Sequence, residues 1–146
     1  MKISTKGRYA IRLMLDIARH SSGENVSLKE ISKRQDISLK YLEQIVNALS
    51  KAGFLRSQRG SQGGYKMTRK PEEYTLLDIL EVTEGGMAPV ACLEDEINQC
   101  PRSAKCPTIE MWSGLYEVIT NYLRGITIAD LINKAEENDD DFGYYI

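Results

Sequence analysis

The residues with the most distinctive chemistry in this sequence are three cysteines in one short segment. Cys92, Cys100 and Cys106 are separated by seven and five residues, with glycines and prolines nearby. Such a loop could wrap a metal centre, since its backbone is not committed to a helix or a sheet. Three thiolates suit an iron–sulfur cluster, which usually takes four, and they suit zinc if a nitrogen or oxygen atom completes the set. A redox-active thiol pair with one spare cysteine also fits the spacing.

A DNA-recognition helix is predicted to begin after its N-cap Ser38. It should end near Lys51, because Gly53 suits the C′ position of a helix. Its apolar residues recur at helical spacing and predict one buried face. They are Leu42, Ile45, Val46 and Leu49. The opposite face presents Lys40, Glu43 and Gln44. Gln44 could form two hydrogen bonds with adenine, and Glu43 could accept one from cytosine.

A basic hairpin with a glycine-rich tip follows this helix. Residues 54–58 and 64–68 predict two short strands, and three of the six residues from 59 to 64 are glycine. Glycine permits the positive φ angles of a tight turn. Arg59 at the tip suits insertion into a narrow minor groove, where the negative potential is strongest.

Five further residues are predicted to contact the DNA backbone. Ser38 and Tyr41 lie at the start of the recognition helix, where polar groups contact phosphates and set the register. Lys2, Ser4 and Lys6 lie in the N-terminal segment, and neutralising phosphates there would make affinity depend strongly on salt.

The charge distribution supports DNA binding by the N-terminal half of the chain. Residues 1–70 contain 15 Lys and Arg against 5 Asp and Glu, whereas residues 71–146 contain 4 against 16. A basic half followed by an acidic half is typical of a chain that binds a polyanion with one part only. We find no apolar run long enough to span a membrane and no signal peptide, and therefore expect a cytoplasmic protein. No nucleophile–histidine pair or phosphate loop suggests an enzyme.

The remaining elements predict a mainly α fold, a winged helix-turn-helix with a two-stranded wing and a long C-terminal dimerisation helix. Helices are expected from about residue 10 to 20, from 28 to 35, and from the cap Thr75 to about 82. An apolar stripe from Met111 to Ile126 predicts a long helix that pairs with a second copy. A last helix should run from Thr127 to about Ala135.

Three regions follow from these elements. Residues 1–70 form the DNA-binding domain, residues 71–135 the cysteine loop and dimerisation helices, and residues 136–146 a flexible acidic tail. The tail ends in two tyrosines and an isoleucine, which suits recognition of a C-terminal peptide by a partner.

Three motifs resemble those of the IscR/CymR/NsrR family of bacterial winged helix-turn-helix transcription regulators, which includes the iron–sulfur cluster regulator. They lie at residues 2–10, 37–44 and 59–65. The similarity extends through the cysteines to about residue 135. It implies a homodimer that binds double-stranded DNA through the positions of Lys40, Glu43, Gln44 and Arg59. It also implies a cluster, expected to be [2Fe–2S], on the three cysteines.

The fourth ligand departs from the family pattern. The resemblance implies a histidine three residues after the third cysteine, where this chain has Ile109, which cannot bind iron. Related nitric-oxide sensors use a carboxylate at the position of Arg8. The lone histidine, His20, ends a helix and is expected to interact with its dipole. We expect an oxygen ligand, with Glu110 as the first candidate.

Two functions are therefore predicted. In the first, a homodimeric regulator senses iron–sulfur status through the cluster on the three cysteines. In the second, which the resemblance to CymR implies, the chain represses sulfur metabolism and is controlled by cysteine synthase bound to the C-terminal tail.

Overall fold

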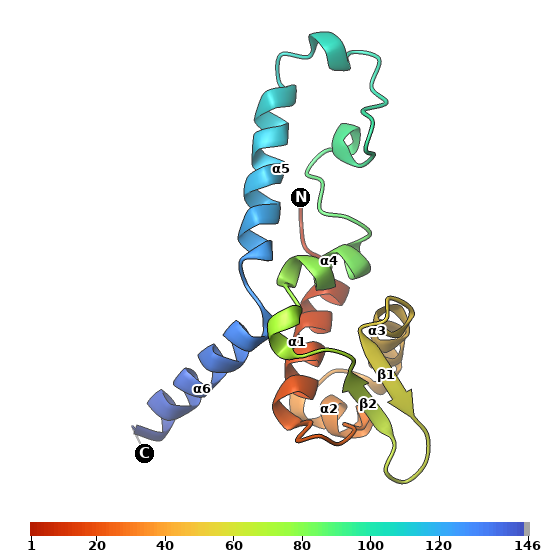
Figure 1. Cartoon of the computed structure of the whole chain (residues 1–146), viewed down its shortest axis with the longest axis vertical. Coiled ribbons are helices and arrows are strands. Elements are labelled where there is room, and N and C mark those ends of the chain that lie inside the picture. Colours follow the sequence, from red (N-terminus) through yellow and green to blue (C-terminus); the bar gives the residue numbers. More distant parts are fainter. Residues whose placement is uncertain (145–146) are drawn as a thin grey trace.

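The structure is a computed structural model that describes residues 1–144, which form six α-helices, two strands and three short 3₁₀ turns. Figure 1 shows a lower body of helices and wing, from which one long helix projects. The helices are α1 (Thr5–His20), α2 (Leu28–Gln35), α3 (Leu39–Lys51), α4 (Leu76–Glu84), α5 (Ile109–Arg124) and α6 (Ile128–Tyr144), and the strands are β1 (Leu55–Gln58) and β2 (Gly64–Met67). The predicted mainly α winged helix-turn-helix is confirmed.

Hydroxyl caps begin most of the helices where the sequence predicts them. Ser27 accepts a hydrogen bond from the N–H of Glu30, and Ser38 accepts one from Tyr41. Thr75 and Thr127 each form a reciprocal capping box with the aspartate three residues later. These local bonds satisfy backbone donors that the first helical turn leaves free, and so fix where each helix starts.

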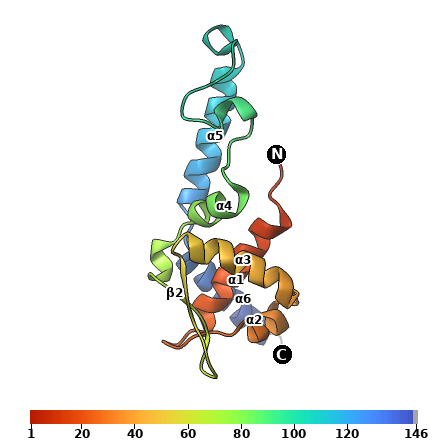
Figure 2. The same cartoon turned by 90° about the vertical axis from the view of Figure 1, so that its right-hand side faces the viewer.

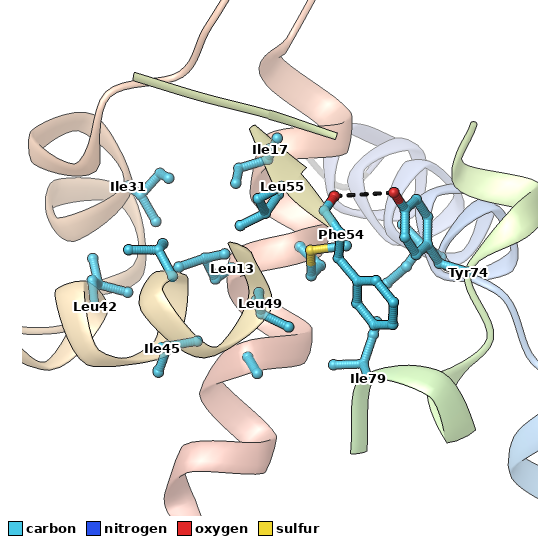
Figure 3. Close-up of a cluster of buried hydrophobic side chains, with 14 of the residues drawn as sticks. Leu13, Ile17, Ile31, Leu42, Ile45, Leu49, Phe54, Leu55, Tyr74 and Ile79 are labelled. Atoms are coloured by element: carbon cyan, nitrogen blue, oxygen red, sulfur yellow. Dashed lines mark hydrogen bonds between the residues drawn. The ribbon is translucent and has the colours of Figure 1, made fainter. Parts of the chain in front are cut away.

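The core of the DNA-binding region lies between α1, α2, α3 and the wing (Figure 3). Leu13, Ile17, Ile31, Leu42 and Leu49 are among its most deeply buried side chains. The predicted apolar face of α3 is buried as expected.

The same core continues beyond residue 70, because Tyr74, Ile79 and Ile128 belong to it. Tyr74 is fully buried, and its hydroxyl donates to the carbonyl of Phe54 at 3.0 Å and accepts from the N–H of Arg69 at 3.0 Å (Figure 3). One phenol therefore joins both ends of the wing to the segment before α4. The predicted boundary at residue 70 does not separate two hydrophobic cores.

Helix α5 rises away from this body and bears the cysteine loop at its far end (Figures 1 and 2). A smaller apolar cluster lies at its base. It contains Leu77, Leu80 and Met87, with Ile3, Tyr116 and Ile119 packed against them. This cluster joins the N-terminal segment, α4, the start of the loop and α5.

The last helix does not end near Ala135 as predicted, but continues through residues that were predicted to form a flexible tether. Helix α6 continues to Tyr144 and packs against α1, and Arg19 of α1 forms an ion pair with Asp139 at 2.6 Å. Alanine and glutamate favour a helix, and the apolar side chains of Leu131 and Ile132 contact the core. The last two residues of the predicted recognition peptide, 145 and 146, lie outside the described residues.

Candidate nucleic-acid interface and cysteine loop

A groove of about 560 Å³ lies between α3 and the wing. Its helix side contains the predicted base-contacting residues Lys40, Glu43 and Gln44, which are all exposed. Its other side contains Ser57 and Tyr65 of the strands. The groove thus places hydrogen-bonding side chains of two elements on one open surface.

The fold of the wing depends on its contacts with the segment before α2. Tyr65 exchanges two backbone hydrogen bonds with Val26, at 2.8 and 2.9 Å. Gly64 has a φ of 143°, and a Cβ atom there would lie 2.4 Å from the carbonyl oxygen of Val26. Glycine is therefore required at this position, and the close approach holds the strands beside the helix-turn-helix. Arg59 lies at the exposed tip between them.

The start of α1 lies beside the start of α3. A hollow of about 380 Å³ is lined by Thr5 and Tyr9 of the first helix and by Ser38 and Tyr41 of the third. The rings of Tyr9 and Tyr41 pack edge to face with centroids 5.7 Å apart. Tyr41 is therefore half-buried.

Of the predicted backbone contacts in the N-terminal segment, Lys2 is exposed and Lys6 is half-buried. The hydroxyl of Ser4 already has partners within the chain. It donates to the carboxylate of Glu84 at 2.5 Å and accepts from the N–H of Gly7 at 3.1 Å. Its contact with DNA remains a prediction, as do those of the other residues.

An ion pair with a buried carboxylate joins α1 to α2. Asp16 is fully buried and accepts hydrogen bonds from Arg34 at 2.7 and 3.0 Å and from the amide of Gln35 at 2.9 Å. The hydrogen bond with Asp16 raises the pKa of Arg34 above its ordinary value. This pair orients the helix that precedes the recognition helix. Sequence reasoning missed it, because an aspartate on an apolar helix face shows no partner until the chain is folded.

The cysteine loop, between α4 and α5, contains the 3₁₀ turns η2 (Ala91–Leu93) and η3 (Ser103–Lys105). Cys92, Cys100 and Cys106 are free and half-buried. The Thr108 hydroxyl bonds to the sulfur of Cys106 at 3.3 Å and lowers the pKa of that thiol. The chemistry of the donors suits a soft metal centre, since thiolates are its preferred ligands.

The arrangement of these donors does not form a ready metal site. Across the described part of the chain, no three histidine, cysteine, aspartate or glutamate side chains gather closely enough to hold an ion. Glu110, the candidate fourth ligand, is exposed in the first turn of α5, and Ile109 is half-buried beside it. His20 lies at the end of α1, with its Nδ1 3.0 Å from the carbonyl oxygen of Asp16. The loop therefore has to rearrange before its three thiols can bind the same metal centre.

The apolar stripe of α5 divides into two faces. Ile119 packs against the small cluster at the base of α5, and Ile126, which follows the end of the helix, packs against the main core. Met111, Leu115, Val118 and Tyr122 remain exposed, with 55%, 41%, 66% and 69% of their surface accessible. An isolated helix with four large apolar side chains in water is the pattern of an interaction surface.

No helix within residues 1–144 is both long and apolar enough to cross a lipid bilayer.

The fold and the exposed groove define a winged helix-turn-helix protein of the DNA-binding class. A sequence profile of Rrf2, described as an iron-dependent transcriptional regulator, matches residues 3–134. The chain belongs to the Rrf2 family of transcriptional regulators, and its relatives are regulators rather than enzymes.

The relatives include transcriptional regulators with different names. The chain is 41% identical over 135 residues to protein rrf2 of Nitratidesulfovibrio vulgaris, which covers 92% of this chain and 89% of that one. It is 38% identical over 136 residues to IscR of Aliivibrio salmonicida, covering 93% and 80%. It is 36% identical over 146 residues to CymR of Bacillus subtilis, covering 100% of both chains.

Solved structures give the same result. The structure of CymR, the global cysteine regulator of B. subtilis, has a TM-score of 0.74 at 33% identity and covers 92% of this chain and 98% of that chain. The structure of T. potens IscR has a TM-score of 0.72 at 37% identity and covers 94% and 90%. The family is therefore shown, and both kinds of regulator resemble this chain closely.

Proposed function

We propose that this chain is a homodimeric transcription regulator that binds double-stranded DNA through α3 and the wing. The groove between these elements is the observation that supports it best, because Lys40, Glu43 and Gln44 face the same open space as Ser57 and Tyr65. Short polar side chains near the start of a helix suit base edges in the major groove. Arg59 at the wing tip would enter the adjacent minor groove.

Selection of duplexes from a random library, followed by binding measured as fluorescence anisotropy, tests this proposal. Gln44→Ala should weaken binding to the selected duplex by about 1–3 kcal/mol and relax the preference at one base pair. Lys40→Ala should weaken binding by a similar amount, because it removes a hydrogen-bond donor to base edges from the same groove. Lys134→Ala on α6 removes an exposed lysine far from the groove, and so controls for net charge. If Gln44→Ala and Lys40→Ala both bind the selected duplex as tightly as the wild type, the assignment of this groove as the DNA-binding surface is refuted.

The exposed face of α5 supports a homodimer in which two copies of this helix pair. Covering Met111, Leu115, Val118 and Tyr122 with the same four residues of a second copy would remove both sets from water. A two-fold pairing would also present two recognition helices to a palindromic duplex. Light scattering coupled to size exclusion should give twice the chain mass, and a monomer at micromolar concentration would contradict this step.

For the signal, we propose iron–sulfur sensing through Cys92, Cys100 and Cys106, with Glu110 as fourth ligand. Three uncommitted thiols in one loop support it, together with the IscR relatives. A bound [2Fe–2S] cluster would supply redox sensitivity, and an oxygen ligand would make its loss easier than full thiolate ligation would. The chain's part is to hold the donors in a loop that can rearrange, with Thr108 favouring the thiolate form of Cys106.

Anaerobic reconstitution tests this signal directly. The full chain should acquire iron, sulfide and visible charge-transfer absorption, all lost in a variant with the three cysteines changed to alanine. Glu110→Ala should leave a less stable absorption band, whereas Glu117→Ala, about two turns further along α5, should not. A chain that takes up neither iron nor sulfide would refute the sensing role and leave DNA binding untouched.

A second candidate signal is a protein partner, because CymR matches this chain over its full length. In that case cysteine synthase would bind the C-terminal tail, as the resemblance implies, and no metal would be required. Removing residues 141–146 should then abolish a complex that the full chain forms with the enzyme. If the full chain forms no complex with cysteine synthase, this candidate fails.

A further inference from the structure

One carboxylate links two segments that lie 80 residues apart in the sequence. Glu84 is the last residue of α4, yet its Oε1 atom lies at the start of α1. It accepts a hydrogen bond from the backbone N–H of Ser4 at 3.1 Å and another from the Ser4 hydroxyl at 2.5 Å. Ser4 in turn caps the helix by accepting from the N–H of Gly7 at 3.1 Å.

The surrounding packing is built around this carboxylate. A Cβ atom on the buried Gly7 would lie 2.3 Å from Oε1 of Glu84, so the close approach depends on a glycine there. Ile3, the residue before Ser4, packs into the small cluster with Leu80 and Met87. The segment that precedes α1 is thus held by an apolar contact at one residue and by two hydrogen bonds at the next.

This anchorage leaves Lys2 as the first exposed charged residue of the arm, by which we mean residues 1–4. The arm leads into the end of α1 that lies beside Ser38 and Tyr41 of the recognition helix. Lys2 lies three residues before Thr5, so the arm keeps it within about 10 Å of that end of α1, and it lines a hollow with Glu84 and Glu94.

The sign of the charge on Glu84 makes its role unexpected. A carboxylate near a DNA-contacting arm repels phosphates, although it interacts favourably with the N-terminal end of a helix dipole. Any benefit to DNA binding must therefore come from the hydrogen bonds that order the arm rather than from charge.

We propose that Glu84 is a positioning residue for DNA binding, which holds the arm through Ser4 so that Lys2 contacts a phosphate. The inference rests on the proposed DNA-binding function and adds a residue to it from outside the winged helix. Since Glu84 directly precedes the cysteine loop, the same contact joins that loop to the DNA-binding surface.

The experiment measures binding of the full-length protein to a duplex selected with the wild type. Glu84→Ala should weaken binding about tenfold, because an arm without its two hydrogen bonds loses an ordered charged contact, and should lower the salt slope by about 0.9. Glu84→Gln keeps an acceptor for Ser4 and should bind within about twofold of the wild type. Thr127→Ala, which removes the cap of α6 at a comparable cost in stability, should leave both quantities unchanged.

A double-mutant comparison separates positioning from general destabilisation. In a Lys2→Ala background, Glu84→Ala should cost no further affinity, because the contact that it positions is already absent. If Glu84→Ala binds the duplex as tightly as Thr127→Ala does, or more tightly than the wild type does, the positioning role is overturned while the DNA-binding function stands. Equal losses in Glu84→Ala and Glu84→Gln would also overturn it. If the wild type binds no duplex at all, the proposed function itself fails, and the role of Glu84 fails with it.

Discussion

The ion pair between Asp16 and Arg34 predicts an asymmetry between two substitutions of the same contact. The Asp16 side chain is 0% exposed, whereas 32% of the Arg34 side chain is accessible to water. Arg34→Ala therefore leaves a carboxylate buried without its main partner. Asp16→Ala leaves a guanidinium that can turn towards solvent.

The expected magnitudes follow from that difference in exposure. Removing one partner so that a buried charge remains costs about 3–5 kcal/mol, which we expect for Arg34→Ala. Asp16→Ala should cost about 1–3 kcal/mol, the usual effect of unmaking hydrogen bonds around a partly exposed group. Replacing both residues with apolar side chains of similar size, Asp16→Leu with Arg34→Met, should cost less than Arg34→Ala alone, because no buried charge is left.

Urea unfolding followed by circular dichroism at neutral pH gives the three free energies of unfolding. Arg19→Ala is a matched control, since it removes an arginine from the exposed ion pair with Asp139, and should cost under about 1 kcal/mol. The reasoning is refuted if Arg34→Ala is no more destabilising than Asp16→Ala, or if the apolar pair is as unstable as Arg34→Ala.

Three further substitutions test other parts of the fold. Val118→Asp on the exposed face of α5 should shift the protein from dimer to monomer in light scattering, because burying each valine contributes about 1–2 kcal/mol; an unchanged mass would contradict pairing through this face. Tyr74→Phe, which removes the hydroxyl that joins both ends of the wing, should lower the free energy of unfolding by about 1–3 kcal/mol. Gly64→Ala should distort the wing, since its Cβ atom would lie 2.4 Å from a carbonyl oxygen, and should weaken DNA binding more than it weakens chain stability; equal binding by the alanine variant would be inconsistent with this geometry.

Helix starts could be predicted from the sequence because their causes are local. Ser27, Ser38 and Thr75 lie directly before apolar residues at helical spacing, and each forms the predicted cap. The tip of the wing was predictable for the same reason, since glycines in a short hairpin identify the turn without reference to the rest of the chain.

The end of the chain shows how a composition-based prediction fails. The acidic residues after Ala135 lack an apolar stripe, and we predicted a flexible tether from that composition. In the structure the helix that began at Ile128 simply continues, and Asp139 meets Arg19. An already nucleated helix adds residues at little cost, and the partner that favours this extension is 120 residues away in sequence.

The apolar stripe of α5 was predicted as one continuous dimerisation surface. In the structure, part of it packs against the rest of the chain and part of it is exposed. Ile119 and Leu115 are both apolar and lie four residues apart, so their spacing says nothing about which neighbour covers either of them. Ile119 packs against the small cluster, whereas Leu115 stays exposed. The positions of α4, Met87 and Ile3 decide this, and they depend on contacts distant in sequence.

The predicted DNA surface and the cysteine loop lie at opposite ends of the molecule (Figures 1 and 2). The sequence analysis predicted no contact between them, because every candidate was chosen for its own chemistry. The structure joins them through Met87, which packs with Ile3, and through Glu84, which binds Ser4. Glu84 lies eight residues before Cys92, the first of the three thiols, so a rearrangement that gathers the thiols can extend to the residues that follow Glu84. Gly85 and Gly86 lie between the helix and the loop with φ angles of 76° and 138°, and glycine allows such a segment to change direction at low cost. The segment from Glu84 to Met87 therefore connects the cysteine loop to the arm through these two contacts, and substitutions there should alter DNA affinity without changing either the cysteines or the recognition helix.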